Sequence, residues 1–187
     1  LDPGHSGPFE PGACAGGATE AELVLSIARR LRRRLLADGH GVLMTRTGDI
    51  DDDELGWRAA MSNRWNADIF LSIHANSAEN TSAHGTEVWH YPGSSAGEAL
   101  ARVIQTGIIA RLHTADRGIK AKDFQVLRET DCPAVLIETA FLSNSEDRIL
   151  LAKPDWQEEL AIAVAESFGP VPRQAAVPAF LTPISLF

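Results

Sequence analysis

The chain opens with the stretch Leu1-Asp2-Pro3-Gly4-His5-Ser6-Gly7, in which an apolar strand end leads into a Gly/Pro turn that presents a histidine. Two apolar runs further along also carry ionisable side chains near their ends, at residues 69–76 (IFLSIHAN) and 134–139 (AVLIET). Thr19-Glu20-Ala21-Glu22 has the form of a helix start. Strands that alternate with helices in this way predict a single α/β domain, with a mixed, mostly parallel central sheet flanked by helices.

Size and composition are those of one globular domain. The 187 residues can bury a core, 44% of them are hydrophobic and 22% are charged, and no apolar run approaches the roughly 20 residues that a membrane-spanning helix needs. The net charge of −8 argues against a nucleic-acid partner, because phosphate binding relies on a basic surface. The one basic cluster, at residues 29–34, is interpreted as a solvated helix face, with contact to nucleic acid or a membrane surface as the lesser alternative.

Hydrophobic periodicity predicts the remaining elements. Thr19 with Glu22 three residues later has the form of a capping box, and apolar residues then recur at helical spacing until Gly39 ends the helix. A loop is expected at residues 8–17, and residues 117–129 show a mixed pattern. Strands are expected at residues 41–46, 68–75, 86–91 and 134–138, and helices at residues 54–65, 95–113 and 156–168.

The two chain ends and the cysteines carry weaker signals. From Gly169 the pattern lapses into an apolar stretch with four prolines, so residues 1–168 are interpreted as the domain and 169–187 as a linker or tail without an assigned function. No signal peptide is visible, but the chain begins inside an expected strand, so we expect a processed or missing N-terminus. Cys14 and Cys132 lack the spacing of a zinc ribbon and could form one disulfide or stay reduced.

Four ionisable residues stand where a strand ends or a helix begins, at the sheet edge where α/β proteins usually bind ligands. They are His5, Glu20, His74 and Glu138. Two imidazoles and one carboxylate on separate elements can bind Zn²⁺ and leave a fourth position for water. The second carboxylate, Glu138, could then transfer the proton of that water. The spacing alone is a weak signal, because ligands so far apart form no compact motif.

Each candidate also has a structural interpretation. His5 could merely cap its turn, and Glu20 in a first helical turn is favoured by the helix dipole by about 0.3–1 kcal/mol. Glu22 is explained by the capping box. His74 and Glu138 are harder to explain structurally, because each closes an apolar strand where an unpaired ionisable group would be costly if buried.

Other aromatic and imidazole side chains are secondary candidates. His84 precedes an expected strand and is retained as a substrate-side candidate. The four tryptophans occur at helix or strand spacing, so we expect them in the core rather than in a sugar-binding platform.

Taken together, the sequence resembles the zinc-dependent N-acetylmuramoyl-L-alanine amidases of the amidase type 3 family. Order and spacing agree from residue 1 to about residue 168, and a match spread over six blocks is far more specific than any one of them. The matching stretches are LDPGH at 1–5, TEAELVL at 19–25, LSIHAN at 71–76, DRGIK at 116–120, FQVLR at 124–128 and PAVLIETAFLSN at 133–144.

The resemblance implies that His5, Glu20 and His74 hold one zinc ion and that Glu138 is the catalytic carboxylate. In this family, zinc-activated water attacks the amide between the lactyl group of N-acetylmuramic acid and L-alanine of the peptidoglycan stem peptide. Glu138 would take the proton of the water and pass it to the leaving amine. Arg128 corresponds to a recurrent family arginine and is expected near the substrate.

The resemblance also implies a partner and a cellular location. Peptidoglycan is the implied partner, and the cell envelope, periplasmic or extracellular, is the implied location. We expect a monomer. Some family members carry a long insertion whose helix blocks the zinc until an activator removes it, whereas residues 92–116 here leave room for one core helix. We therefore expect an open site that needs no activator.

Two other functions stay open. One is a zinc peptidase that acts on another amide of the stem peptide, since both enzymes would use the same chemistry. The other, from a different class, is an inactive wall-binding regulator, which would be expected to lose a ligand or the carboxylate, whereas all four positions are filled here. The sequence does not separate a bacterial wall-remodelling enzyme from a phage lysin.

Overall fold

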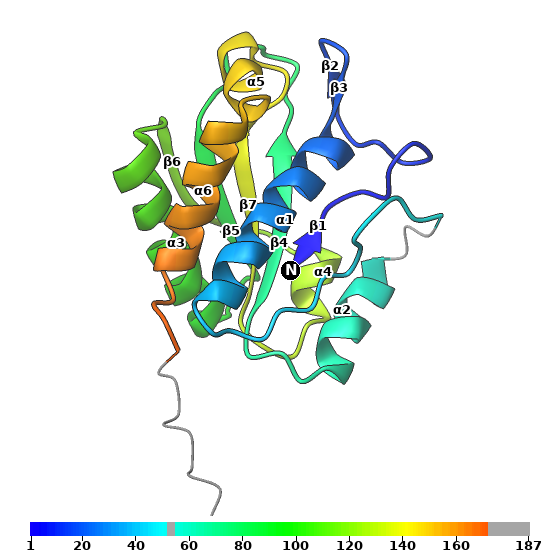
Figure 1. Ribbon diagram of the computed structural model, residues 1–187, viewed down its shortest axis with the longest axis vertical. Helices are drawn as coiled ribbons and strands as arrows, with labels where there is room; N and C mark the ends of the chain where they lie inside the picture. Colours follow the sequence, from blue (N-terminus) through cyan, green and yellow to red (C-terminus); the bar gives the residue numbers. More distant parts are fainter. Residues whose placement is uncertain (52–54, 172–187) are drawn as a thin grey trace, which may run out of the picture.

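A five-stranded sheet runs through the middle of the protein, whose computed structural model describes residues 1–51 and 55–171 (Figure 1). Its strands are β1 (Asp2–Pro3), β4 (Phe70–Asn76), β5 (Thr86–His90), β6 (Asp116–Ala121) and β7 (Ala134–Phe141). In space their order is β1-β4-β7-β5-β6. Neighbouring strands are parallel except β5 and β7, which are antiparallel, so the predicted mixed and mostly parallel sheet is confirmed.

Helices cover both faces of this sheet. The larger core lies under α1 (Glu20–Ala37), α3 (Ser95–Leu112) and α6 (Pro154–Glu166), which pack against one face and against each other. On the opposite face, α4 (Gln125–Arg128) covers a smaller apolar cluster, and α2 (Leu55–Arg64) packs beside it. The short helix α5 (Ser145–Leu151) follows β7.

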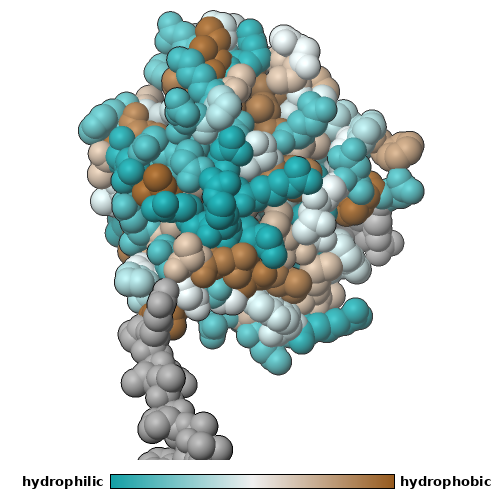
Figure 2. All heavy atoms as spheres, in the orientation of Figure 1, coloured by the Kyte–Doolittle hydropathy of each residue, from teal (hydrophilic) through white to brown (hydrophobic). Residues whose placement is uncertain are grey.

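The first helix forms as its sequence predicts. Thr19 is its N-cap and its Oγ1 accepts a hydrogen bond from the Glu22 backbone N–H at 3.3 Å. Residues at helical spacing, from Val24 to Leu35, are buried against the sheet. The arginines of residues 29–34 are exposed or half-buried, and Figure 2 shows hydrophilic side chains across the outer surface of α1 and α6. The predicted solvated face is therefore confirmed.

Strand alternation determines which side chains reach the smaller-core face. In β4, Leu71, Ile73 and Ala75 belong to the larger core, so the side chains between them, including His74, point to the opposite face. In β7, Ile137 belongs to the larger core and Leu136 to the smaller one, so Glu138 points to the same face as His74. The parity of two strands thus places these two ionisable groups side by side.

Several expected elements differ from the structure. Residues 41–46 form no strand, because their backbone bonds to the sheet edge are limited to Leu1, whose amino group donates to the Leu43 carbonyl at 2.7 Å and whose carbonyl accepts from Thr45 N–H at 2.9 Å. The expected loop at 8–17 contributes to a small hairpin of β2 (Cys14–Ala15) and β3 (Ala18–Thr19). Residues 117–129 hold most of β6 and all of α4, and α5 was not predicted.

Smaller differences concern boundaries and single side chains. β4 continues past His74 to Asn76, and Trp65, expected in the core, is 48% exposed. Both cysteines are free thiols. Among the described residues, no helix is both long and apolar enough to cross a bilayer. The expected helix start at Glu54 and most of the expected tail, residues 172–187, lie outside the described residues.

A buried charged cluster holds the end of β1. Arg58 donates from Nη1 to Asp2 Oδ1 at 2.7 Å, and Thr45 and Ser72 hydroxyls also donate to the Asp2 carboxylate, each at 2.7 Å. Asp2 and Arg58 are each only 1% exposed. Burial opposes ionisation of Asp2, but Arg58 and the hydroxyls outweigh it and lower the pKa of Asp2. The cluster is therefore ionised and fully hydrogen-bonded at the carboxylate.

Replacing Arg58 by alanine is expected to lower the free energy of unfolding by about 3–5 kcal/mol, because it leaves the Asp2 charge buried without its cation. Urea denaturation at neutral pH measures this change. Arg102→Ala is the matched control, since the Arg102 side chain is 66% exposed and pairs with Glu98 on the surface. Its effect is expected to stay within about 0.5 kcal/mol, and comparable losses in the two variants would contradict the prediction.

Candidate metal centre

His5 follows β1 in a turn that aims its ring inward. Its φ of 63° lies in the left-handed region, which is uncommon for a residue with a side chain. The strain is held by buried arginines: Arg58 Nη2 donates to the His5 carbonyl at 2.7 Å, and Arg46 Nη2 donates to the Gly4 carbonyl at 2.7 Å. On the ring, Nδ1 lies 2.6 Å from Glu10 Oε2 and Nε2 lies 3.0 Å from Glu20 Oε2.

Glu20 is the first residue of α1 and lies between the two histidines. Its Oε1 is 2.9 Å from His74 Nδ1, and the residue as a whole is 5% exposed. Both carboxylate oxygens also accept backbone hydrogen bonds at 3.0 Å, Oε1 from Ala75 N–H and Oε2 from Ala13 N–H. These bonds fix the carboxylate between β4 and the loop before β2.

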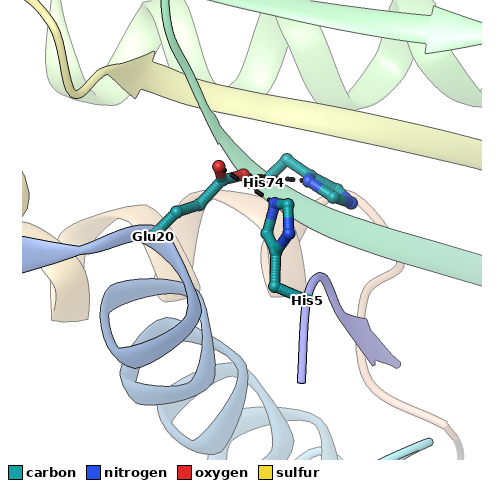
Figure 3. Close-up of side chains that lie close together, drawn as sticks. All are labelled: His5, Glu20 and His74. Atoms are coloured by element: carbon teal, nitrogen blue, oxygen red, sulfur yellow. Dashed lines mark hydrogen bonds and ion pairs between the residues drawn. The ribbon is translucent and has the colours of Figure 1, made fainter. Parts of the chain in front are cut away.

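The three side chains converge on one point, as Figure 3 shows. One ligand atom from each of His5, Glu20 and His74 lies within 4.8 Å of the others. The two imidazole rings meet edge to face, with centroids 5.0 Å apart. Two glycines make room for them, because a Cβ at Gly4 would collide with the His74 ring and a Cβ at Gly12 would lie 2.6 Å from the His5 ring.

Shared protons dominate the electrostatics of this cluster. Burial is the largest single influence and disfavours a charge on His5 and His74, but the hydrogen bonds and charges of neighbouring carboxylates, Glu20 first among them, together outweigh it and raise the pKa of both rings. Burial alone would raise the pKa of Glu20. The hydrogen bonds and charges of the two rings outweigh burial and hold the pKa of Glu20 well below its usual range. The carboxylate is therefore ionised at neutral pH, as a metal ligand must be.

The donor set and its surroundings fit a divalent metal ion. Two imidazole nitrogens and one carboxylate oxygen on three separate elements are a set found in catalytic zinc sites, which leave one further position for water. Second partners orient the ligands, with Glu10 on His5 Nδ1 and backbone N–H groups on Glu20. Binding of a cation is expected to release the protons that the two histidines hold.

Glu138 lies beside the cluster, opposite His74 in the β4–β7 register. Its Oε2 is buried and has no hydrogen-bond partner among the described residues. Burial is the main cause that raises the pKa of Glu138 to about 7; the charges of Glu20 and Glu87 add to it and His74 opposes it. A carboxyl group that titrates near neutral pH can both take up and release a proton during a reaction.

The pKa of Glu138 predicts a pH-dependent stability for the metal-free protein. Between the ordinary glutamate pKa and about 7, the folded protein keeps a proton that the unfolded chain has lost, so the free energy of unfolding falls as the pH rises through this window. Glu138→Gln mimics the protonated form and is expected to be more stable than wild type by roughly 3 kcal/mol at pH 8, with little difference at pH 4. Urea denaturation with a chelator tests this, and an equal difference at both pH values would refute it.

The structure does not bring the two substrate-side candidates into contact with this cluster. Arg128 ends α4, pairs with Asp123 and Glu129, and lines a cavity of about 210 Å³ near the start of β7. His84 is exposed in the loop before β5, where its Nδ1 donates to the Ser82 carbonyl. Their substrate roles therefore stay predictions.

Sequence reasoning missed several residues that hold the site. Glu10 contacts His5 from a loop without periodicity, and Arg46 and Arg58 clamp the turn around His5 from segments distant in the sequence. Glu87 lies opposite Glu138 in the β5–β7 register and is 2% exposed. The one available signal was the placement of charged residues inside otherwise apolar stretches, which marks a buried charge without naming its partner.

The profile of the amidase type 3 family, described as N-acetylmuramoyl-L-alanine amidase, matches residues 1–168. The chain belongs to this family. A related family member, N-acetylmuramoyl-L-alanine amidase LytC of Bacillus subtilis, is 36% identical over 166 residues, which cover 88% of this chain and 33% of LytC. The sporulation-specific N-acetylmuramoyl-L-alanine amidase of the same organism is 38% identical over 164 residues, covering 86% of this chain and 62% of that protein.

Solved amidase structures share the fold. The N-acetylmuramoyl-L-alanine amidase from Clostridium difficile 630 superposes with a TM-score of 0.84 and 32% identity, covering 89% of this chain and 91% of that one. AmiC2 of Nostoc punctiforme gives 0.83 and 36%, with the same coverage. This chain thus spans nearly all of these solved chains, but only a third of LytC and about three fifths of the sporulation-specific amidase.

Proposed function

We propose that this amidase hydrolyses the amide between the lactyl group of N-acetylmuramic acid and L-alanine of the peptidoglycan stem peptide. The observation that carries the proposal is the convergence of His5, Glu20 and His74, with Glu138 opposite His74 on the next strand. Relatives and solved structures named N-acetylmuramoyl-L-alanine amidase support the choice of bond. Residues 1–168 would form the catalytic domain, and residues 169–187 would take no part in catalysis.

The side chains divide the work between metal binding and proton transfer. His5, Glu20 and His74 would hold one Zn²⁺, which when bound supplies Lewis-acid activation of a water molecule and of the amide carbonyl. Glu138 takes a proton from the attacking water and passes it to the nitrogen that leaves with L-alanine. Arg128 and His84 would contact the substrate from the rim.

We also propose that the site works without an activator, in a monomer located in the cell envelope. The segment that could have held a blocking helix forms α3 instead, which packs against α6 and the sheet face opposite to the side chain of His74. Its side chains contribute to the larger core, so they support an open site. The solved amidase CwlD of Clostridioides difficile forms a complex with the lipoprotein GerS, so turnover by the purified chain alone is the relevant test.

The experiment incubates purified protein with peptidoglycan, with and without a chelator, and identifies the soluble products by mass spectrometry. Free stem peptides with an L-alanine amino terminus, lost on chelation and restored by Zn²⁺, would support the amidase. Peptide fragments that keep the muramoyl-L-alanine bond would instead identify a zinc peptidase. Binding to peptidoglycan without any product, at full metal occupancy, would identify a wall-binding protein.

A further inference from the structure

The stretch DRGIK at residues 116–120 takes no part in the metal centre. It forms most of β6, which is the edge strand of the sheet beyond β5 (Figure 1). Between β6 and the β7 residue Glu138 lies only β5, whose Glu87 is the register partner of Glu138. Adjacent strands are about 4.8 Å apart, so β6 runs roughly 10 Å from the proposed reaction centre.

Two basic side chains of β6 contact Glu87, the residue opposite Glu138. Arg117 Nε lies 2.6 Å and Lys120 Nζ 2.5 Å from the same Glu87 oxygen, while Asn76 Nδ2 donates to the other oxygen at 2.9 Å. Two cations therefore share one carboxylate. The side chains of Arg117 and Lys120 are each about one third exposed, so the surplus positive charge faces solvent on the same side of the sheet as Glu138.

A further cation extends this charge over an aromatic surface. Lys122 Nζ lies 4.6 Å from the Phe124 ring centroid and 5.8 Å from that of Trp89, and Lys120 Nζ lies 5.1 Å from the Trp89 ring. Lys122 is exposed and has no ion pair within residues 1–51 and 55–171. We call Trp89, Lys120, Lys122 and Phe124 the cationic surface.

Of the two lysines in the cationic surface, Lys120 shares the Glu87 carboxylate with Arg117, and Lys122 has no acidic partner among the described residues. The Asp116 carboxylate accepts hydrogen bonds from Gln105 and from the Gly118 N–H, and Asp123 pairs with Arg128. In a chain with a net charge of −8, a local excess of cations beside the reaction centre indicates a negatively charged ligand.

We propose that the cationic surface binds a carboxylate on the peptide part of the substrate, two or three residues beyond the scissile amide. This inference rests on the proposed amidase function, which puts the scissile amide next to Glu138. An extended peptide advances about 3.3–3.6 Å per residue, so two residues cover about 7 Å and three cover about 10 Å of the path from β7 to β6. Lysine ammonium groups over aromatic rings are attractive partners for a carboxylate, and the rings offer apolar contact to the peptide backbone.

The test compares two ligands that differ in one charge. The first is an N-acetylmuramoyl-L-alanyl peptide with a free glutamate carboxylate at its second residue, and the second is the same compound with a carboxamide in that place. Binding is measured by NMR titration on the metal-loaded Glu138→Gln protein, so that turnover does not consume the ligand. KM and kcat are measured in parallel on protein that keeps Glu138.

With all the lysines in place, the protein is expected to bind the acid about two- to five-fold more tightly than the amide at low salt. In the kinetic measurements, the two ligands are expected to differ in KM rather than in kcat. Lys122→Gln and Lys120→Gln are expected to lose this preference. Lys153 is an exposed lysine at the start of α6 with no ion pair to any residue that the structure describes, so Lys153→Gln is expected to keep the preference. The preference should also shrink at high ionic strength, because salt screens exposed charges.

Equal affinities for acid and amide in wild type, or a preference that survives in both lysine variants, would overturn the cationic surface as a binding site. An acid preference that depends on these lysines, in a protein that releases no peptide from peptidoglycan, would uphold the surface and reject the amidase function. The two proposals therefore fail independently.

Discussion

Glu138→Gln is expected to lower kcat for peptidoglycan hydrolysis by about 10²–10⁴-fold, because the carboxamide cannot accept the proton of the attacking water. The geometry makes this loss specific to proton transfer. Glu138 stands opposite His74 but is not among the three residues that converge as metal ligands, so the variant is expected to keep its metal. Peptide release, measured by mass spectrometry alongside the metal content of the same sample, checks both halves of the prediction.

Glu79→Gln provides the matched control for Glu138→Gln. Glu79 is an exposed glutamate in the loop after β4, close in sequence to His74 but outside the cluster. The control is expected to keep wild-type kcat. Near-wild-type turnover in Glu138→Gln at full metal occupancy would show that another group transfers the proton.

Glu20→Gln is expected to weaken metal binding by more than about 100-fold and to abolish activity at low metal concentration. Losing an outer partner of a metal ligand already costs 10–100-fold in affinity, and this substitution removes the charged ligand itself. It also removes the carboxylate that both histidines contact, at 3.0 Å for His5 and 2.9 Å for His74. Competition with a chromophoric chelator measures the affinity without relying on turnover.

The control for Glu20→Gln lies two residues along the same helix turn. Glu22 is exposed, and its backbone N–H donates to the Thr19 hydroxyl that caps α1, so Glu22→Gln is expected to bind metal as wild type does. Added Zn²⁺ is expected to restore part of the activity of Glu20→Gln, because the two histidines remain. Unchanged affinity in Glu20→Gln would remove Glu20 from the metal site.

Local sequence patterns were sufficient for the elements with strong periodicity. The capping residue Thr19, the helical stripe behind it and the apolar runs of β4 and β7 are short-range signals, and each appears in the structure where it was expected. The weakly periodic residues 117–129 gave no such signal, so β6 was missed. Its pairing with β5 depends on contacts between segments about 30 residues apart, which no local window contains.

The chemistry of the site divides along the same line. The sequence by itself determined which residue types stand at the strand and helix ends, and so proposed His5, Glu20, His74 and Glu138 as candidates, because an ionisable group that closes an apolar run is costly unless it has a partner. Only the tertiary structure decided which partners these residues have, since strand order and side-chain parity bring together groups that are far apart along the chain.

The contacts that hold the turn carrying His5 likewise depend on the tertiary structure. Arg46 and Arg58 reach the carbonyls of the turn around His5 from loops and helices more than 40 residues away, as their sequence separations of 42 and 53 show. Buried guanidinium groups must find acceptors wherever the fold presents them, and those acceptors are backbone carbonyls that any sequence would carry. The residue types in the sequence therefore indicated the candidate ligands, whereas the packing of distant segments determined how the ligands are held.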